Sequence, residues 1–223
     1  MSRGPRLVLL GKQGAGKGTQ AARLAEHYGI AHVSTGDLLR AAAAAGTPAG
    51  KEAEQYMNRG ELVPDDLVLR IVEERFAEDG LADQGFVLDG FPRTLAQAEK
   101  LEEILAGHPL DLVINLDVPT EIVLDRIAGR RVCENCGTTY HVSAPPKDDW
   151  TCDVCGGRVV QRDDDTEEAV MRRLELYEKE TVPIIDYYRK LGKLAVVDGT
   201  GDSDEVFERL VQQVEQRLKA LET

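Results

Sequence analysis

Short apolar runs alternate along the chain with longer segments whose apolar residues recur at helical spacing. The run RLVLL, Arg6–Leu10, predicts a buried strand, and Lys17–Tyr28 predicts a helix that ends before Gly29. We expect further strands at residues 30–33, 85–89, 111–118 and 194–197. We expect further helices at residues 37–45, Pro48–Asn58, Asp65–Ala77, 94–106, 120–127, 166–191 and Ser203–Leu221. Pro183 should bend the 166–191 helix, because proline cannot donate a backbone hydrogen bond.

This alternation of strands and helices is typical of an α/β fold with a parallel sheet covered on both faces. Two segments interrupt the alternation. One is helical and lies between about residues 34 and 63, and the other, at 129–158, is rich in Gly, Pro and Cys. We therefore predict a three-layer core with a five-stranded parallel sheet and two insertions. The expected boundaries are a core of residues 1–33, 64–128 and 166–223, a helical insertion at 34–63, and a cysteine-bearing insertion at 129–165.

Composition narrows the class of protein. Hydrophobic residues make up 42% of the 223 residues and charged residues 30%, which is usual for soluble globular proteins. The net charge is −13, and this excess of acid opposes a nucleic-acid-binding surface. The apolar run at residues 7–10 is too short for a secretion signal or a membrane span. We expect a cytoplasmic protein with neither nucleic acid nor membrane as a partner.

The stretch GKQGAGKGTQ, residues 11–20, lies between the first expected strand and the first expected helix. Its glycines allow backbone N–H groups to surround phosphate oxygens, and the helix N-terminus adds its dipole. In this strand–loop–helix context, Lys17 is the residue expected to reach the β- and γ-phosphates of a nucleotide. Lys12 lies in the variable part of the loop and is interpreted as a solvated surface lysine. Gly18 follows Lys17 where Ser or Thr is common, and the hydroxyl comes one residue later, at Thr19.

The four cysteines form two C-x2-C pairs separated by 15 residues: Cys133, Cys136, Cys152 and Cys155. In a cytosolic chain this spacing indicates a metal site rather than disulfides. Four protein ligands would complete a tetrahedral site, so the metal should be structural, with zinc as the first choice and iron or cobalt as alternatives. The segment has few apolar residues, and metal binding would supply its folding free energy. It would then form a rigid flap that closes over the bound nucleotide and excludes water.

Several motifs occur in the order seen in one enzyme family. After GKQGAGKGTQ come STGDLLR (34–40), GELVPDDLV (60–68), GFVLDGFPRTLAQAE (85–99), DRIAGRR (125–131) and QRDDDTEEAVMRRL (161–174). Together they make the chain similar to the adenylate kinases, which are nucleoside monophosphate kinases, and the cysteines resemble the zinc-bearing, long-lid bacterial type. The chain departs from that family at Lys12, where a small residue is usual, and at Gln13, where proline is usual.

The resemblance implies magnesium-dependent transfer of a phosphoryl group from ATP to AMP, giving two ADP, by a monomer. Residues 34–63 would be the AMP-binding insertion and residues 129–165 the zinc-stapled lid. The implied ATP site is Gly14, Ala15, Gly16, Lys17, Gly18, Thr19, Arg126, Arg130, Thr139, Tyr140 and Gly201. The implied AMP site is Thr35, Arg40, Glu61, Leu62, Val63, Gly90, Phe91, Pro92, Arg93, Gln97, Arg162 and Arg173. The implied catalytic residues are Lys17, Arg93, Arg130, Arg162 and Arg173.

The residue types fit this chemistry. Phosphoryl transfer needs positioning and charge stabilisation, and arginine binds phosphate oxygens with two donors while it stays charged. The amide of Gln97 can donate and accept at once, as the edge of adenine requires, or it is an exposed helix residue. Asp89 ends an apolar strand and either orients magnesium and its waters or begins a turn. Tyr140 either stacks on a base or packs on the cysteine pairs.

Other segments have simpler interpretations. Asp164 and Asp165 would cap the helix that follows and pair with its dipole. The resemblance implies that they help to close the lid by pairing with Arg130 or Arg131, and both roles can hold together. Trp150 is expected to be a packing residue. The four histidines are scattered without ligand spacing and are interpreted as structural or surface residues.

Four functional alternatives remain open from the sequence. The acceptor could be UMP or CMP, although related pyrimidine kinases tend to carry Asn soon after the FPR segment and lack a long zinc lid. GTP could replace ATP as donor. A zinc-ribbon nucleic-acid-binding NTPase is opposed by the negative charge, and a nucleotide-binding regulator without turnover is opposed by the full set of arginines.

Overall fold

A computed structural model describes residues 3–77 and 80–222 of the chain. Among these residues, five parallel strands form the central sheet in the order β2-β3-β1-β4-β8. The strands are β1 (Arg6–Leu10), β2 (Ala31–Ser34), β3 (Phe86–Asp89), β4 (Leu112–Asp117) and β8 (Leu194–Asp198). The predicted α/β class and the predicted parallel sheet are confirmed.

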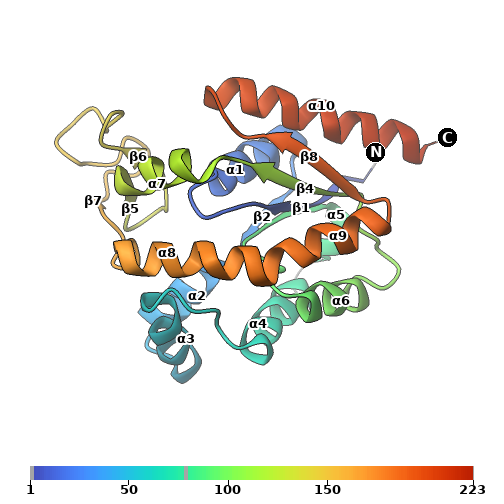
Figure 1. The fold of residues 1–223 in the computed structure, drawn as a ribbon, viewed down its shortest axis with the longest axis horizontal. Coiled ribbons are helices and arrows are strands. Elements are labelled where there is room, and N and C mark those ends of the chain that lie inside the picture. The colour runs from blue at the N-terminus through green and yellow to red at the C-terminus, as the bar shows by residue number, and fades with distance from the viewer. Residues whose placement is uncertain (1–2, 78–79, 223) are drawn as a thin grey trace.

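Helices cover both faces of this sheet, as Figure 1 shows. The helical segments of the described chain are α1 (Lys17–Tyr28), α2 (Thr35–Ala44), α3 (Pro48–Asn58), α4 (Asp65–Ala77), α5 (Leu81–Gln84), α6 (Leu95–Ile104), α7 (Thr120–Ala128), α8 (Glu167–Leu176), the π-helix η1 (Tyr177–Thr181), α9 (Val182–Lys190) and α10 (Ser203–Leu221). Leu7 and Leu9 pack with α1, α7 and α10, whereas Val8 and Leu10 pack with α4, α6 and α9. Because neighbouring side chains of a strand point to opposite faces, the four apolar residues that follow Arg6 in β1 contribute to two cores at once.

The central position of β1 determines where the glycine-rich loop lies. In the parallel register Leu9 is opposite Asp89 of β3, and Leu10 is opposite Asn115 of β4. The carboxyl ends of these strands therefore meet at one edge of the sheet, which is where ligands bind in open α/β folds. The loop that follows β1 opens at this edge.

Two groups of elements extend beyond the sheet and its covering helices (Figure 1). Helices α2 and α3 pack against each other between β2 and α4. In the cysteine-bearing segment, the short strands β5 (Arg130–Cys133), β6 (Thr139–His141) and β7 (Val159–Val160) form an antiparallel sheet in the order β6-β5-β7. Cys133, Cys152 and Val159 are buried there with Tyr140 and Trp150 packed against them, so the predicted packing role of Trp150 is confirmed.

The predicted helix at 166–191 is interrupted earlier than expected. The structure divides it into α8, η1 and α9, and the N–H of Val182 bonds to the carbonyl of Tyr177, five residues back. Pro183 has no N–H to give and would clash with the preceding turn of an α-helix. The chain accommodates this proline by widening the turn just before it.

Other differences from the expected elements are small. The single-turn helix α5 was not predicted, because four residues carry too little periodicity. Helix α2 begins at Thr35 and not at residue 37 as expected, since the hydroxyl of Ser34 accepts from the N–H of Asp37 and caps the helix. In the described part of the chain, the longest helices are too polar or too short to cross a membrane.

Candidate functional site

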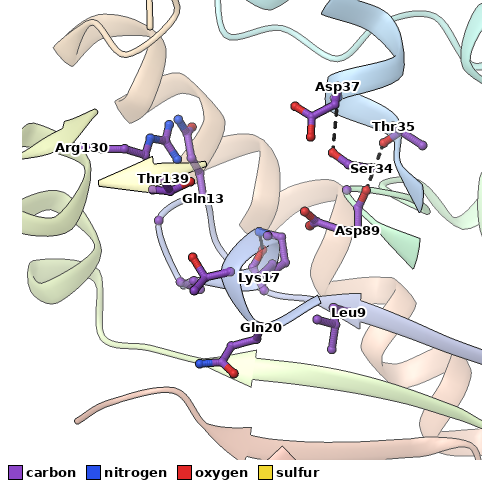
Figure 2. A pocket seen from close by; sticks show the side chains of 18 of the residues that line it. Leu9, Gln13, Lys17, Gln20, Ser34, Thr35, Asp37, Asp89, Arg130 and Thr139 are labelled. Carbon is purple, nitrogen blue, oxygen red and sulfur yellow. Dashed lines mark hydrogen bonds between the residues drawn. The ribbon is translucent and has the colours of Figure 1, made fainter. Parts of the chain in front are cut away.

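A cavity of about 1130 Å³ opens at the carboxyl edge of the sheet. Figure 2 shows side chains from the glycine-rich loop, β2, α2, β3, β5 and β6 pointing into it. The structure brings every residue of the two implied nucleotide sites to the wall of this one cavity, together with Asp89. Segments more than a hundred residues apart in sequence thus share a single pocket, large enough for two nucleotides.

The glycine-rich loop connects β1 to α1 in a conformation that favours anions. Gly14 and Gly16 have φ angles of 80° and 97°, in the left-handed region where other residues are strained. A Cβ on Gly14 would also lie 2.6 Å from Ile127 Cγ1. Gly16 caps α1 without a side-chain hydrogen bond, which leaves backbone N–H groups at the helix start free to bind phosphate.

Lys17 is held inside the loop. Its Nζ donates to the carbonyls of Gly11 and Lys12, at 2.9 Å each. Desolvation lowers the pKa of Lys17 to about 8, with the nearby charge of Asp89 acting in the opposite direction and Arg93 and Arg130 adding to the decrease. A polyphosphate would supply the negative charge that stabilises the ammonium form, so the site is suited to an anionic ligand.

Lys12 is not the solvated surface lysine that the sequence predicted. Its side chain is 17% exposed, and Nζ donates to the carbonyl of Val118 at 3.3 Å and lies 4.0 Å from the carboxylate of Glu178. These partners follow the loop in sequence by more than a hundred residues, so local sequence gave no sign of them. Lys12 fastens the outer part of the loop to the end of β4 and to η1.

Arginines converge around Lys17, and several are paired with carboxylates. Arg40 Nη2 donates to Asp37 Oδ1 at 2.5 Å, and Arg173 Nη2 donates to Asp164 Oδ2 at 2.6 Å and to the carbonyl of Met57 at 2.8 Å. Together with Arg162 and Arg130, these arginines line the cavity at positions from four different segments. The carboxylates balance positive charge that phosphates could balance instead.

Arg162 is the least satisfied of these arginines. Its side chain is 21% exposed, and its Nε is buried without a hydrogen-bond partner in the described structure. Desolvation, followed by the charges of Arg40 and Arg130, lowers the pKa of Arg162 to about 10. A bound anion would accept from this unpaired donor and would stabilise the charged form of Arg162 against the neighbouring arginines.

Asp164 and Asp165 do not cap helix α8, contrary to one of the two interpretations. The cap is Thr166, whose Oγ1 accepts from the N–H of Ala169 at 3.2 Å. Asp165 instead accepts from Arg130, with Nε to Oδ2 at 2.8 Å and a second, short contact between Nη2 and Oδ1. The predicted pairing with Arg130 is confirmed for Asp165, whereas Asp164 pairs with Arg173. The pair of Arg130 and Asp165 joins the first strand of the lid to the segment that leaves the lid.

Thr35 and Gln97 lie on the side of the cavity next to α2 and α6. Gln97 is 2% exposed, so the interpretation as an exposed helix residue is wrong. Its Oε1 accepts from the N–H of Arg93 at 2.8 Å, and its Nε2 donates to Asp65 at 2.7 Å. The amide is therefore held in a fixed orientation by protein partners. Thr35 Oγ1 reaches the carbonyl of Asp89 at 3.4 Å (Figure 2).

Arg126 and Tyr140 lie on the other side, next to the lid. Arg126 donates to the carbonyls of Ala15 and Gly199, at 3.2 and 3.1 Å, and so bridges the glycine-rich loop to the segment after β8. The hydroxyl of Tyr140 donates to Cys152 Sγ at 3.4 Å and accepts from the N–H of Asp153 at 2.8 Å. Tyr140 therefore packs on the cysteine pairs, although part of it still lines the cavity.

The four cysteine sulfurs lie within 4.8 Å of one another, as a metal site requires. The Sγ atoms of Cys133 and Cys155 are 3.5 Å apart, as are those of Cys136 and Cys152. Four thiolates around a tetrahedral zinc ion are separated by about 3.8 Å, given Zn–S distances of ~2.3 Å. The donor set and spacing fit one metal ion. The hydrogen bond from Tyr140 lowers the pKa of Cys152 to about 6, whereas at Cys155 the opposing backbone hydrogen bond of Gly157 is outweighed by the sulfurs of Cys136 and Cys133, which raise the pKa of Cys155 to about 12.

The structure adds residues that the sequence analysis did not assign to the site. Asp37 pairs with Arg40 and lies 3.9 Å from Arg162, and its place in the STGD motif was the available signal. Gln13 donates to Asp165, for which sequence gave no signal. His141, interpreted as structural or surface, lines the cavity from β6, with its Nδ1 next to Ser143.

Comparison with known proteins gives one consistent family. The adenylate kinase family model matches residues 9–193. An adenylate kinase from Thermodesulfovibrio yellowstonii is 55% identical over 215 residues, which cover 95% of this chain and 100% of that protein. Adenylate kinases from Archaeoglobus fulgidus and Bacillus subtilis are 55% and 52% identical, over 92% and 90% of this chain and 95% and 94% of theirs. The chain belongs to the adenylate kinase family.

Proposed function

We propose that the cavity binds ATP and AMP on opposite sides of Lys17 and transfers a phosphoryl group between them. The reaction of the family is ATP + AMP giving two ADP, and this chain catalyses it as a transferase that binds ATP, AMP and ADP. The observation that carries the residue assignment is the convergence of both implied sites on one cavity that several arginines line.

In the proposed ATP site, residues 14–19 surround the β- and γ-phosphates. The free N–H groups at the start of α1 and the Nζ of Lys17 supply the donors. Arg126, Gly201, Thr139 and Tyr140 hold the nucleoside from the α7 side and the lid side of the cavity. Lys17 would leave the carbonyls of Gly11 and Lys12 for the phosphates, since both acceptors are neutral and a phosphate is charged.

In the proposed AMP site, Arg40, Arg93, Arg162 and Arg173 hold the phosphate, and Thr35 and Gln97 contact the nucleoside. Residues 61–63 and 90–92 complete the wall. The amide of Gln97 would exchange its present partners for the edge of adenine, or read the base from its held position. Segment 34–63 is then the AMP-binding insertion, and segment 129–165 is the lid over ATP.

The transfer forms a bond between a phosphate oxygen of AMP and the γ-phosphorus of ATP, while the bond from that phosphorus to the β-γ bridging oxygen breaks. The attacking oxygen is already deprotonated, so no general base is required. Lys17, Arg93, Arg130, Arg162 and Arg173 stabilise charge on the oxygens of the transferred group. Closure of the lid would exclude water, which could otherwise accept the phosphoryl group.

Magnesium and zinc have separate proposed roles. Adenylate kinases use Mg²⁺ with ATP, and when bound the ion would neutralise negative charge on the phosphates. Asp89 fits an indirect role, because it ends β3 beside the loop and its Oδ2 lies 3.4 Å from where a Cβ of Gly18 would be. Cys133, Cys136, Cys152 and Cys155 would bind zinc and keep the lid folded. We further propose a cytoplasmic monomer without nucleic-acid or membrane partners.

Substitutions on opposite sides of the cavity test the site assignment. We expect Arg40→Met to raise KM for AMP about tenfold or more, because a charged hydrogen bond to the phosphate is lost, and to leave KM for ATP within about twofold. Arg126→Met should raise KM for ATP by about tenfold or more and leave KM for AMP within about twofold. Initial rates measured with one nucleotide varied at saturation of the other would show the split. Equal effects on both KM values, or a reversed pattern, would refute the two-sided assignment.

A further inference from the structure

Gln13 connects the glycine-rich loop to the base of the lid. Its Nε2 donates to Asp165 Oδ1 at 3.1 Å, across 152 residues of sequence. Its Oε1 is buried without a hydrogen-bond partner in the described structure, so the contact with Asp165 alone orients the amide. Figure 2 shows the side chains of Gln13 and Arg130 next to one another, each reaching from a different element.

The carboxylate of Asp165 accepts hydrogen bonds from both Gln13 and Arg130. Its own side chain is 0% exposed, and it accepts two hydrogen bonds from Arg130 in addition to the one from Gln13. A buried carboxylate that loses its charged partner is strongly destabilised unless other donors remain. Among the donors present, only Gln13 is neutral and belongs to the nucleotide-binding loop.

In the proposed function, Arg130 donates to the transferred phosphoryl group while Asp165 holds its Nε and its Nη2. A guanidinium has five N–H donors, so Nη1 and the second N–H of Nη2 remain for a phosphate oxygen. The amide of Gln13 donates to the same oxygen of Asp165 that Arg130 Nη2 contacts, and so fixes the carboxylate that orients Arg130. Without this donor the carboxylate is free to rotate, and the guanidinium bound to it is aimed less accurately at ATP.

We propose that Gln13 is a positioning residue that acts through Asp165 to orient Arg130 toward ATP. The inference rests on the proposed role of Arg130. It links the loop that binds the phosphates to the residue pair at the base of the lid. Gln13 itself need not touch the reacting atoms.

The test is a double-mutant cycle on kcat/KM for ATP with Gln13→Met, which keeps the length of the side chain but removes the donor. In the otherwise unchanged protein, we expect kcat/KM for ATP to fall about fivefold to tenfold, with KM for AMP within about twofold. In protein that carries Asp165→Asn, no buried carboxylate needs the donor. The same Gln13→Met change should then alter kcat/KM for ATP by less than about twofold.

Two controls separate the possible outcomes. Lys12→Met, on the same loop but without contact to Asp165, should have the same effect with and without Asp165→Asn. Arg130→Lys should lower kcat at least about tenfold if Arg130 has its proposed role. An equal loss from Gln13→Met in both backgrounds, or no loss in either, overturns the inference about Gln13. If Arg130→Lys leaves kcat unchanged, the proposed role of Arg130 fails instead, and the inference fails with it.

Discussion

Replacement of Lys17 by methionine is expected to lower kcat by about 10²–10³-fold, the effect of losing one preorganised donor to developing charge. Lys17 is the cation that the loop itself supplies, and its Nζ lies 2.9 Å from two loop carbonyls that a phosphate can replace. Because methionine has a similar length and no charge, the loop should keep its shape. Steady-state rates at saturating ATP and AMP measure the effect.

The matched control for this prediction is Lys12→Met, five residues earlier on the same loop. Lys12 is bound to Val118 and lies near Glu178, away from the proposed phosphate positions. We expect kcat to change by less than about threefold, with a lower melting temperature as the main result. A loss from Lys12→Met as large as that from Lys17→Met would mean that the loop needs both lysines for its shape, and that the charge of Lys17 has no special role.

Removal of the metal is expected to unfold the lid. The lid core consists of Cys133, Cys152 and Val159 with two aromatic side chains, which is too little buried apolar surface to fold alone. Metal binding contributes about 10–16 kcal/mol to the folding of comparably small zinc domains. Chelation, or Cys152→Ser, should therefore lower the melting temperature, reduce bound metal below one ion per chain, and lower kcat/KM for ATP by about tenfold or more.

The control for the metal prediction is Val154→Ser, which lies between Cys152 and Cys155 and is 72% exposed. This change should leave metal content and activity within the error of the assay. Elemental analysis and thermal unfolding, with and without chelator, measure both proteins. The structural role of the metal would be excluded if metal-free protein kept its melting temperature and its activity.

Much of the fold could be predicted because its signals are local. The apolar β1, the glycines of the loop and the helical spacing of residues 17–28 are all read within a few residues of one another. The cysteine pairs predicted a sulfur cluster, since their spacing limits where the four sulfurs can go. The motifs of the family predicted which segments would share a cavity, which spacing alone could not have done.

The features that were missed depend on contacts between distant segments. Lys12 was interpreted as a surface residue because nothing near it in sequence indicates Val118 or Glu178. Gln97 was not expected to be buried, because its partner Asp65 lies on another helix, α4. The π-helix before Pro183 was missed because a proline signals a disturbance of a helix but not the form that it takes. Asp165 could be assigned to pairing rather than capping only when Thr166 was seen to cap α8.

The most direct test of the central claim is to mix the protein with magnesium and ATP, offer AMP, UMP, CMP and GMP separately, and measure the diphosphates formed. The account predicts rapid conversion of AMP, with two ADP formed for each ATP consumed, and little conversion of the other three. Conversion of UMP or CMP in preference to AMP would contradict the assignment of Gln97 and the acceptor site. If no acceptor yielded a diphosphate, the claim that this cavity transfers a phosphoryl group between two nucleotides would be wrong.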